Sequence, residues 1–216
     1  MTATEGRERS LATLDEGTSR LVRMSAILAI ADEPTIRSEL SRAMEVAPAV
    51  WIEELILQCY LFCGFPRALN AMREWRRLTP VPLAEEDGGD DVEWRRRGEI
   101  TCRAVYGPMY DRLRVNIRAL HPELDEWMIV EGYGKVLSRP GLDLPRRELC
   151  IVAACAASEQ ARQLHSHLHG ALNVGVAPSV VLEAIEALDG VVAQASLEST
   201  RLLARRVLAQ AAVRDA

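Results

Sequence analysis

The sequence has few aromatic residues and no long hydrophobic run. Aromatic side chains make up only 5% of the 216 residues. No apolar stretch approaches the roughly 20 residues that a membrane-spanning helix needs. Residues 1–16 are polar and contain no apolar segment of the kind found in export signals. We therefore expect no membrane span and no export, and we expect a cytoplasmic location.

Two further features are missing: an excess of basic charge and an even set of cysteines. The net charge is -5, whereas a protein that binds nucleic acid through phosphate contacts usually has a strongly basic face. A nucleic-acid partner is therefore not expected. An odd number of cysteines in a chain of this length argues against a disulfide scaffold and for reduced, mostly buried thiols. The five are Cys59, Cys63, Cys102, Cys150 and Cys155.

What the sequence does contain is typical of helices. Ala, Leu, Glu and Arg are abundant, and these side chains lose little freedom on a helix. Leu21, Met24 and Leu28 recur at helical spacing, and no segment alternates with the period of two that a strand requires. Proline or glycine interrupts the pattern at intervals, for example at 64–66, 107–108 and 138–145. The sequence therefore predicts an all-α fold.

The predicted helices divide into two related units. We expect a flexible polar tail at 1–17, a shortened first unit at 18–79, a linker rich in Pro, Gly and acidic residues at 80–93, and a full second unit at 94–216. Laying Arg20 over Glu148 aligns a helix, a turn and a proline-initiated helix in the same order in both units. Chance similarity between Ala- and Leu-rich helices is the alternative explanation for the repeat.

The densest group of polar side chains lies in the second unit. Gln160, Gln163 and His167 fall on one narrow arc of a helix, and Glu148 precedes them. His165 and His169 have the i, i+4 spacing of a metal-binding pair, but no third ligand lies nearby, so no metal is expected.

The residues alone leave two explanations for His167. It can be an ordinary buried histidine with its hydrogen bonds satisfied. It can also be a catalytic histidine oriented by Glu148, because a carboxylate at one ring nitrogen sets the tautomer and leaves the other nitrogen for proton transfer.

Three stretches resemble motifs of the carboxymuconolactone decarboxylase family. Residues 133–149 read YGKVLSRPGLDLPRREL and are similar to its signature, and residues 164–175, LHSHLHGALNVG, resemble the next motif. Residues 64–71, GFPRALNA, are similar to its closing motif but stand in the first unit. The resemblance covers about 20–78 and 94–208, and it implies the helical bundle of the alkylhydroperoxidase D-like superfamily.

The resemblance also shows where this chain departs from the peroxidases of that superfamily. Matched by spacing, their Glu and His fall on Glu148 and His167, but their two redox cysteines fall on Gln160 and Gln163. Disulfide chemistry needs an attacking thiolate and a resolving sulfur, and glutamine supplies neither. Peroxidase activity by that route is therefore not expected.

What the resemblance implies instead is cofactor-free decarboxylation of a small carboxylated lactone. In that mechanism His167 donates the proton, Glu148 orients it, and Gln160 and Gln163 stabilise the developing oxyanion. Arg139 would pair with a substrate carboxylate, or alternatively cap a helix or contact another subunit. Tyr133 would line the pocket or belong to the core.

Two other functions remain open at this stage: a thiol peroxidase or its reductase partner that uses cysteines at other positions, and a non-catalytic helical oligomer. The first unit has Arg20 and Glu39 where the second has Glu148 and His167. This exchange predicts a structural ion pair in the first unit and one active site per chain. The resemblance implies homo-oligomers, either trimers or hexamers.

Overall fold

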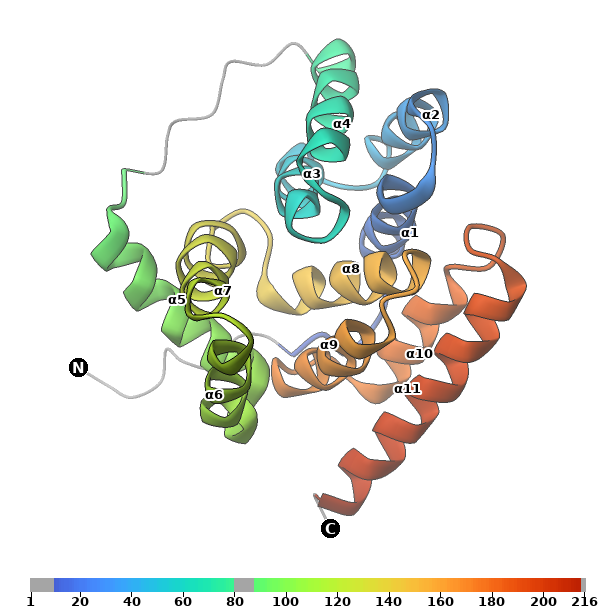
Figure 1. Ribbon diagram of the computed structural model, residues 1–216. Coiled ribbons are helices and arrows are strands. Elements are labelled where there is room, and N and C mark those ends of the chain that lie inside the picture. Colours follow the sequence, from blue (N-terminus) through green and yellow to red (C-terminus); the bar gives the residue numbers. More distant parts are fainter. Residues whose placement is uncertain (1–9, 80–87, 215–216) are drawn as a thin grey trace, which may run out of the picture.

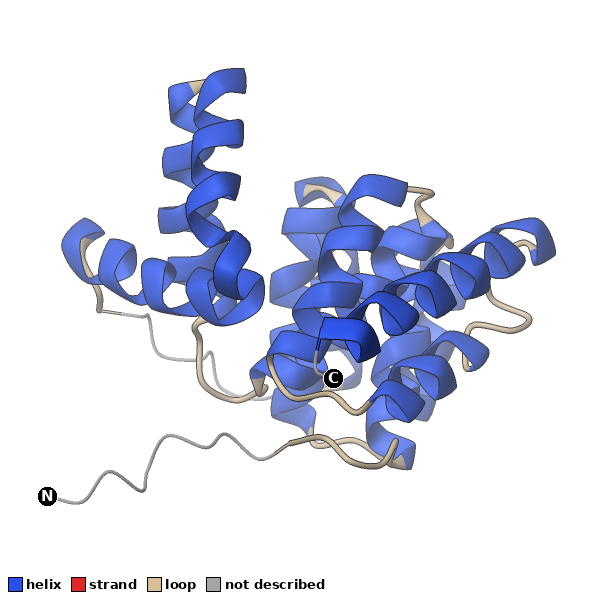
Figure 2. Ribbon diagram, turned by 90° about the horizontal axis from the view of Figure 1, so that it is seen from below, coloured by secondary structure: helices blue, strands red, loops and turns tan. Residues whose placement is uncertain are grey.

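The computed structural model describes residues 10–79 and 88–214, and this part of the chain is built from helices and loops (Figures 1 and 2). The first half holds α1 (Glu16–Ile30), α2 (Glu33–Ala43), α3 (Ala49–Cys63) and α4 (Phe65–Leu78). The second half begins with α5 (Asp91–Tyr106), the 3-10 turn η1 (Gly107–Met109), α6 (Tyr110–Leu120), α7 (Pro122–Trp127) and the π-helical η2 (Met128–Leu137). It continues with α8 (Leu144–Ala157), α9 (Ala161–Asn173), α10 (Pro178–Glu186) and α11 (Gln194–Arg214). The expected all-α class is confirmed.

Helix α8 is the central element. Nearly every residue from Leu144 to Ala156 is buried, including the charged Arg147 and Glu148. Figure 1 shows α8 between the first-half helices and the pair α9 and α10. Leu149 and Ile151 belong to the larger hydrophobic core, whereas Cys150 packs into the core of α1–α4. One helix therefore joins the two halves.

Glycines allow helices α5 and η2 of the second half to pack closely against each other. A Cβ atom added to Gly98 of α5 would overlap the carbonyl oxygen of Ile129, and one added to Gly134 of η2 would overlap that of Trp94. The two helices therefore approach each other at distances that only glycine permits.

Several helix ends differ from the expected ones. The linker was expected to extend to residue 93, but α5 begins at Asp91, with Asp90 accepting a hydrogen bond from the backbone of Glu93. The last helix, α11, continues to Arg214, beyond residue 208, where the family resemblance ends. Residues 80–87, most of the expected linker, lie outside the described residues.

The segment before α1 is partly packed, unlike the flexible tail expected for residues 1–17. Leu11 is buried, and its backbone pairs with the chain at Val176. Only this one apolar residue is buried, and only two backbone hydrogen bonds hold it. Such a short contact leaves no recognisable pattern in an otherwise polar sequence. Residues 1–9 lie outside the described residues. Among the helices that are described, none combines the length and apolarity that a membrane crossing requires.

Candidate acid–histidine site

Glu148 lies in the middle of α8 and is fully buried. Gly170 makes this position possible, because a Cβ atom there would lie 2.5 Å from a Glu148 carboxylate oxygen and 2.8 Å from Val105. The absence of a side chain at Gly170 lets α9 approach α8 and brings its neighbour His167 to the carboxylate.

The predicted pair does meet. Nδ1 of His167 and Oε2 of Glu148 are 2.8 Å apart, and the imidazole side chain is only 6% exposed. The other carboxylate oxygen, Oε1, is buried with no hydrogen-bond partner in the described chain. An unpaired buried oxygen is costly in a structural pair. The site therefore has one hydrogen-bond acceptor in excess of what the fold uses.

Aromatic rings surround the imidazole. Phe62 of α3 meets it edge-to-face with ring centroids 5.5 Å apart, and Tyr106 of α5 does so at 6.5 Å. Tyr106 in turn packs against Tyr133, at 6.2 Å. Burial raises the pKa of both tyrosines well above the ordinary value, so the phenols stay neutral at any physiological pH. The pair therefore lies among aromatic side chains, and Tyr133 is buried behind Tyr106.

Neither glutamine forms a hydrogen bond with the buried pair among the described residues. Both are exposed, and the side-chain amide of Gln160 donates to the carbonyl of Ser158 at 3.2 Å. Helix α9 begins only at Ala161, so Gln160 occupies the position before its first turn. Gln163 is on α9 one turn before His167. Helical periodicity predicted that both amides share a helix face with His167, but it could not predict the residue at which α9 begins.

The structure gives Arg139 a partner within the chain in place of the expected substrate carboxylate. Its guanidinium binds Glu54 of α3, with N–O distances of 3.0 and 3.1 Å. Glu54 also accepts from the fully buried Arg147 at 2.7 Å, and Gln58 completes this arginine's contacts. The four side chains form a buried network between the two halves, next to Glu148 in sequence. Sequence reasoning missed it because its members come from separate helices.

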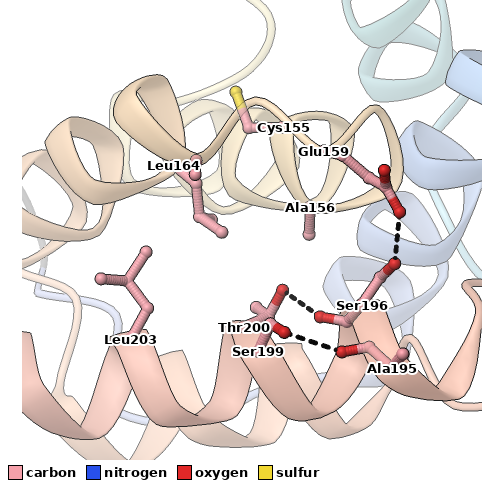
Figure 3. A pocket seen from close by; sticks show the side chains of 10 residues that line it. Cys155, Ala156, Glu159, Leu164, Ala195, Ser196, Ser199, Thr200 and Leu203 are labelled. Carbon is pink, nitrogen blue, oxygen red and sulfur yellow. Dashed lines mark hydrogen bonds between the residues drawn. The ribbon is translucent and has the colours of Figure 1, made fainter.

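Two hollows lie near the pair, although neither is lined by Glu148 or His167. A cavity of about 320 Å³ between α8, α9 and α11 is lined by Cys155, Leu164 and Leu203 on one part and by Ser196 and neighbouring hydroxyls on another (Figure 3). Leu164 precedes His167 by one turn of α9. A larger groove of about 980 Å³ lies beyond Tyr106. The site is thus closed in the single chain, with Phe62 and Tyr106 between the imidazole and open space.

None of the five cysteines is in a disulfide bond. Burial raises the pKa of Cys102, Cys150 and Cys155 to about 12 each, which keeps these thiols protonated. Only the half-buried Cys63, which shares a hydrogen bond with Cys59, has a lowered pKa. The rings of His165 and His169 lie 4.8 Å apart, and the described residues contain no group of three or more potential metal ligands.

The fold and the pair define an all-helical protein with a buried carboxylate–imidazole site. A model of the carboxymuconolactone decarboxylase family matches residues 122–206, which include this site. Peroxisomal protein 2 of Schizosaccharomyces pombe is 31% identical over 149 residues, which cover 66% of this chain and 70% of that protein. The chain belongs to the carboxymuconolactone decarboxylase family.

A second relative, peroxisomal protein 2 of Saccharomyces cerevisiae, is 24% identical over 170 residues, covering 65% of this chain and 60% of that protein. The names of the two relatives contradict the cytoplasmic location expected from the sequence. That expectation rested on the lack of an export signal and a membrane span, and neither feature distinguishes the cytoplasm from an organelle that takes up folded proteins.

Proposed function

We propose that this protein is a cofactor-free decarboxylase, or a related lactone-processing enzyme, that acts on a small carboxylated lactone at the Glu148–His167 pair. The observation that carries the proposal is the 2.8 Å contact between the two side chains, together with the unpartnered second oxygen of Glu148. A purely structural pair would gain stability by satisfying that oxygen.

In the proposed reaction the bond between the ring and the departing carboxylate breaks and CO2 leaves. The electron pair moves through the conjugated ring to the lactone carbonyl oxygen, and a proton from His167 ends on carbon. Glu148 stabilises the charged imidazole through Nδ1, so that the other ring nitrogen carries the proton to be delivered. The dry aromatic surroundings strengthen each of these interactions.

We assign substrate binding to exposed side chains of α9 next to the closed site. Gln163 lies one turn before His167 on the same face of α9 and is our candidate donor to the developing oxyanion. Gln160 is adjacent but already uses its amide on a backbone carbonyl. Phe62 covers the imidazole and must turn aside for a substrate to reach it.

The experiment is a screen of carboxylated lactones that measures CO2 release by wild type and by His167→Asn. We expect the variant to lose roughly a hundredfold or more, the usual scale for a lost general acid. His121→Asn is the matched control, because His121 is exposed and its ring nitrogen only caps α7, a role that asparagine can also fill. Equal turnover by wild type and His167→Asn would refute the assignment.

Replacing all five cysteines with alanine separates this proposal from a thiol peroxidase, since the lyase should keep its turnover in any such variant that folds.

The names of the relatives also lead us to propose the peroxisome as the place of the reaction, which a fluorescent fusion would test against a peroxisomal marker.

Self-association into trimers or hexamers is part of the same proposal. Large apolar side chains are exposed on α6 and α7 and would be covered by such contacts; they are Val115, Leu120, Leu124 and Trp127. Light scattering of the purified protein would give the number of subunits.

A further inference from the structure

The larger of the two hollows near the pair is a groove on the far side of α9 from His167. Its walls are the end of α5 with η1, then α6 and α11, and α9 lies between α6 and α11 (Figure 1). Its volume is about 980 Å³. A helix turns by about 100° per residue, so His165, which lines the groove, points away from the face that carries His167. The groove is therefore a separate site from the acid–histidine pair, with Tyr106 as their shared wall.

The groove is lined by bases and by no acid. Arg112 enters from α6 and Arg206 from α11, and His165 and His169 lie between them on α9. Neither arginine forms an ion pair with any other residue that the structure describes. Most arginines of this chain are paired, for example Arg114 with Asp125 and Arg201 with Glu186. Two unpaired guanidiniums on facing walls therefore favour an anionic ligand.

Most of the remaining lining is apolar. Met109 and Leu113 contribute from one side and Val213 from the other, and Met109 and Val213 are among the exposed large apolar side chains of the molecule. Pockets for small ligands usually have volumes of about 300–1,000 Å³ and are mainly apolar with a few polar groups. This groove fits that description at the upper end of the size range.

One wall is held in place by a side-chain contact. The amide of Asn173, at the end of α9, donates to the carbonyl of Val105 at 2.7 Å and ties the end of α5 to α9. This contact fixes the wall formed by the end of α5 relative to α9.

We propose that this groove is a binding site for an amphipathic carboxylate, that is, an acid with one anionic head and an extended apolar part. The head pairs with Arg112 and Arg206, and the apolar part lies along Met109, Leu113 and Val213. This site is independent of the decarboxylase proposal, because it uses none of the residues assigned to the reaction.

The test is calorimetric titration of the full chain with decanoate. We expect decanoate to bind, whereas acetate, which lacks the apolar part, and decyltrimethylammonium, which has the same chain with a cationic head, bind at least tenfold more weakly. Equal affinity for decanoate and decyltrimethylammonium would show nonspecific hydrophobic binding and would overturn the proposal.

Variants locate the binding. Replacing both Arg112 and Arg206 with Gln should weaken decanoate binding tenfold or more, because the carboxylate loses both of its charged hydrogen-bond donors. Arg205→Gln is the matched control: the residue is exposed, adjacent on α11 and outside the groove. Leu113→Asp should also weaken binding by placing an acid in the apolar part.

Two results would contradict the site. Unchanged affinity in the double Arg variant, with circular dichroism showing an intact fold, would place the ligand elsewhere. If instead Gln210→Trp, which fills the groove, or the double variant changes the sedimentation coefficient of the protein, the groove is a contact between copies of this chain, and the ligand proposal fails.

Discussion

The two halves of the molecule place different side chains at matching positions. In the second half, Glu148 and His167 are separated by 19 positions and meet at 2.8 Å. In the first half, Arg20 and Glu39 are also separated by 19 positions and meet at 3.4 Å. Arg42 binds the other oxygen of Glu39 at 2.7 Å, so both carboxylate oxygens of the first half are paired. One oxygen of Glu148 is not.

The helix ends of the halves agree with this register. Under the overlay of Arg20 on Glu148, α1 coincides with α8, and Asp15 with Asp143 as the residue that caps each helix. Helix α2 likewise begins where α9 does. These agreements support the duplicated unit proposed from the sequence. We propose that the halves are two copies of one unit, in which the second carries a carboxylate with spare hydrogen-bonding capacity and the first carries a closed ion pair.

The first half also stabilises the second, and this support should give the largest effect of any substitution. Glu54→Gln should lower the free energy of unfolding by about 3–5 kcal/mol, because it leaves the buried Arg147 without its charge partner. Urea unfolding measures the change. Glu131→Gln is the matched control, since it breaks an exposed pair with Lys135 worth about 0.5 kcal/mol or less. Equal effects of the two substitutions would mean that the network does not join the halves.

The contrast between the two carboxylates predicts the next largest effect. Glu148→Gln should lower lactone turnover roughly a hundredfold, the scale of a lost acid–base partner, whereas Glu39→Gln should change it less than about twofold. Steady-state rates with both folded variants decide the matter. If Glu39→Gln abolished turnover in a folded protein, the first half would carry catalysis too, and the division between the halves would be lost.

Much of this comparison could be predicted from the sequence. Helical periodicity and capping residues predicted the helices, and the Arg20–Glu148 overlay predicted which pairs would meet. Spacing along one helix does this well because each turn repeats the last. The wall of the site could not be predicted in this way: Phe62, Tyr106 and Glu54 come from helices whose packing angle no local pattern contains.

The same limit explains the residues whose placement differed from expectation. Arg139 lies within a motif that resembles the family signature, but its partner Glu54 is 85 positions away, and only the packing of α3 brings them together. Gln160 was expected on the helix that carries His167, but Glu159 adopts a positive φ of 58° and ends the preceding turn, so α9 starts only at Ala161. A left-handed non-glycine residue gives no clear signal in a single sequence.

The contribution of the first half to the site wall predicts an intermediate effect. Phe62→Ala should cost about 2 kcal/mol of stability, roughly half the value for a fully buried phenylalanine, because Phe62 is partly exposed. It should also speed the reaction of His167 with diethylpyrocarbonate, since the ring that covers the imidazole is gone. Phe65→Ala, on an exposed ring that packs edge-to-face on Tyr60, should leave that reaction unchanged. An unchanged rate in Phe62→Ala would mean that another group covers His167.

The smallest effect tests the symmetry of the halves. Asp15 and Asp143 cap α1 and α8, and both bind Arg146, at 2.8 and 2.5 Å. Each change to Ala should cost about 1 kcal/mol of unfolding free energy, as for other helix caps. The double variant should cost more than the sum, because either aspartate can hold Arg146 after the other is removed. Asp32→Ala, which removes the cap of α2 with no contact to Arg146, should instead add independently to either change. If the losses of unfolding free energy in Asp15→Ala and Asp143→Ala were strictly additive, the two aspartates would not share Arg146 in solution.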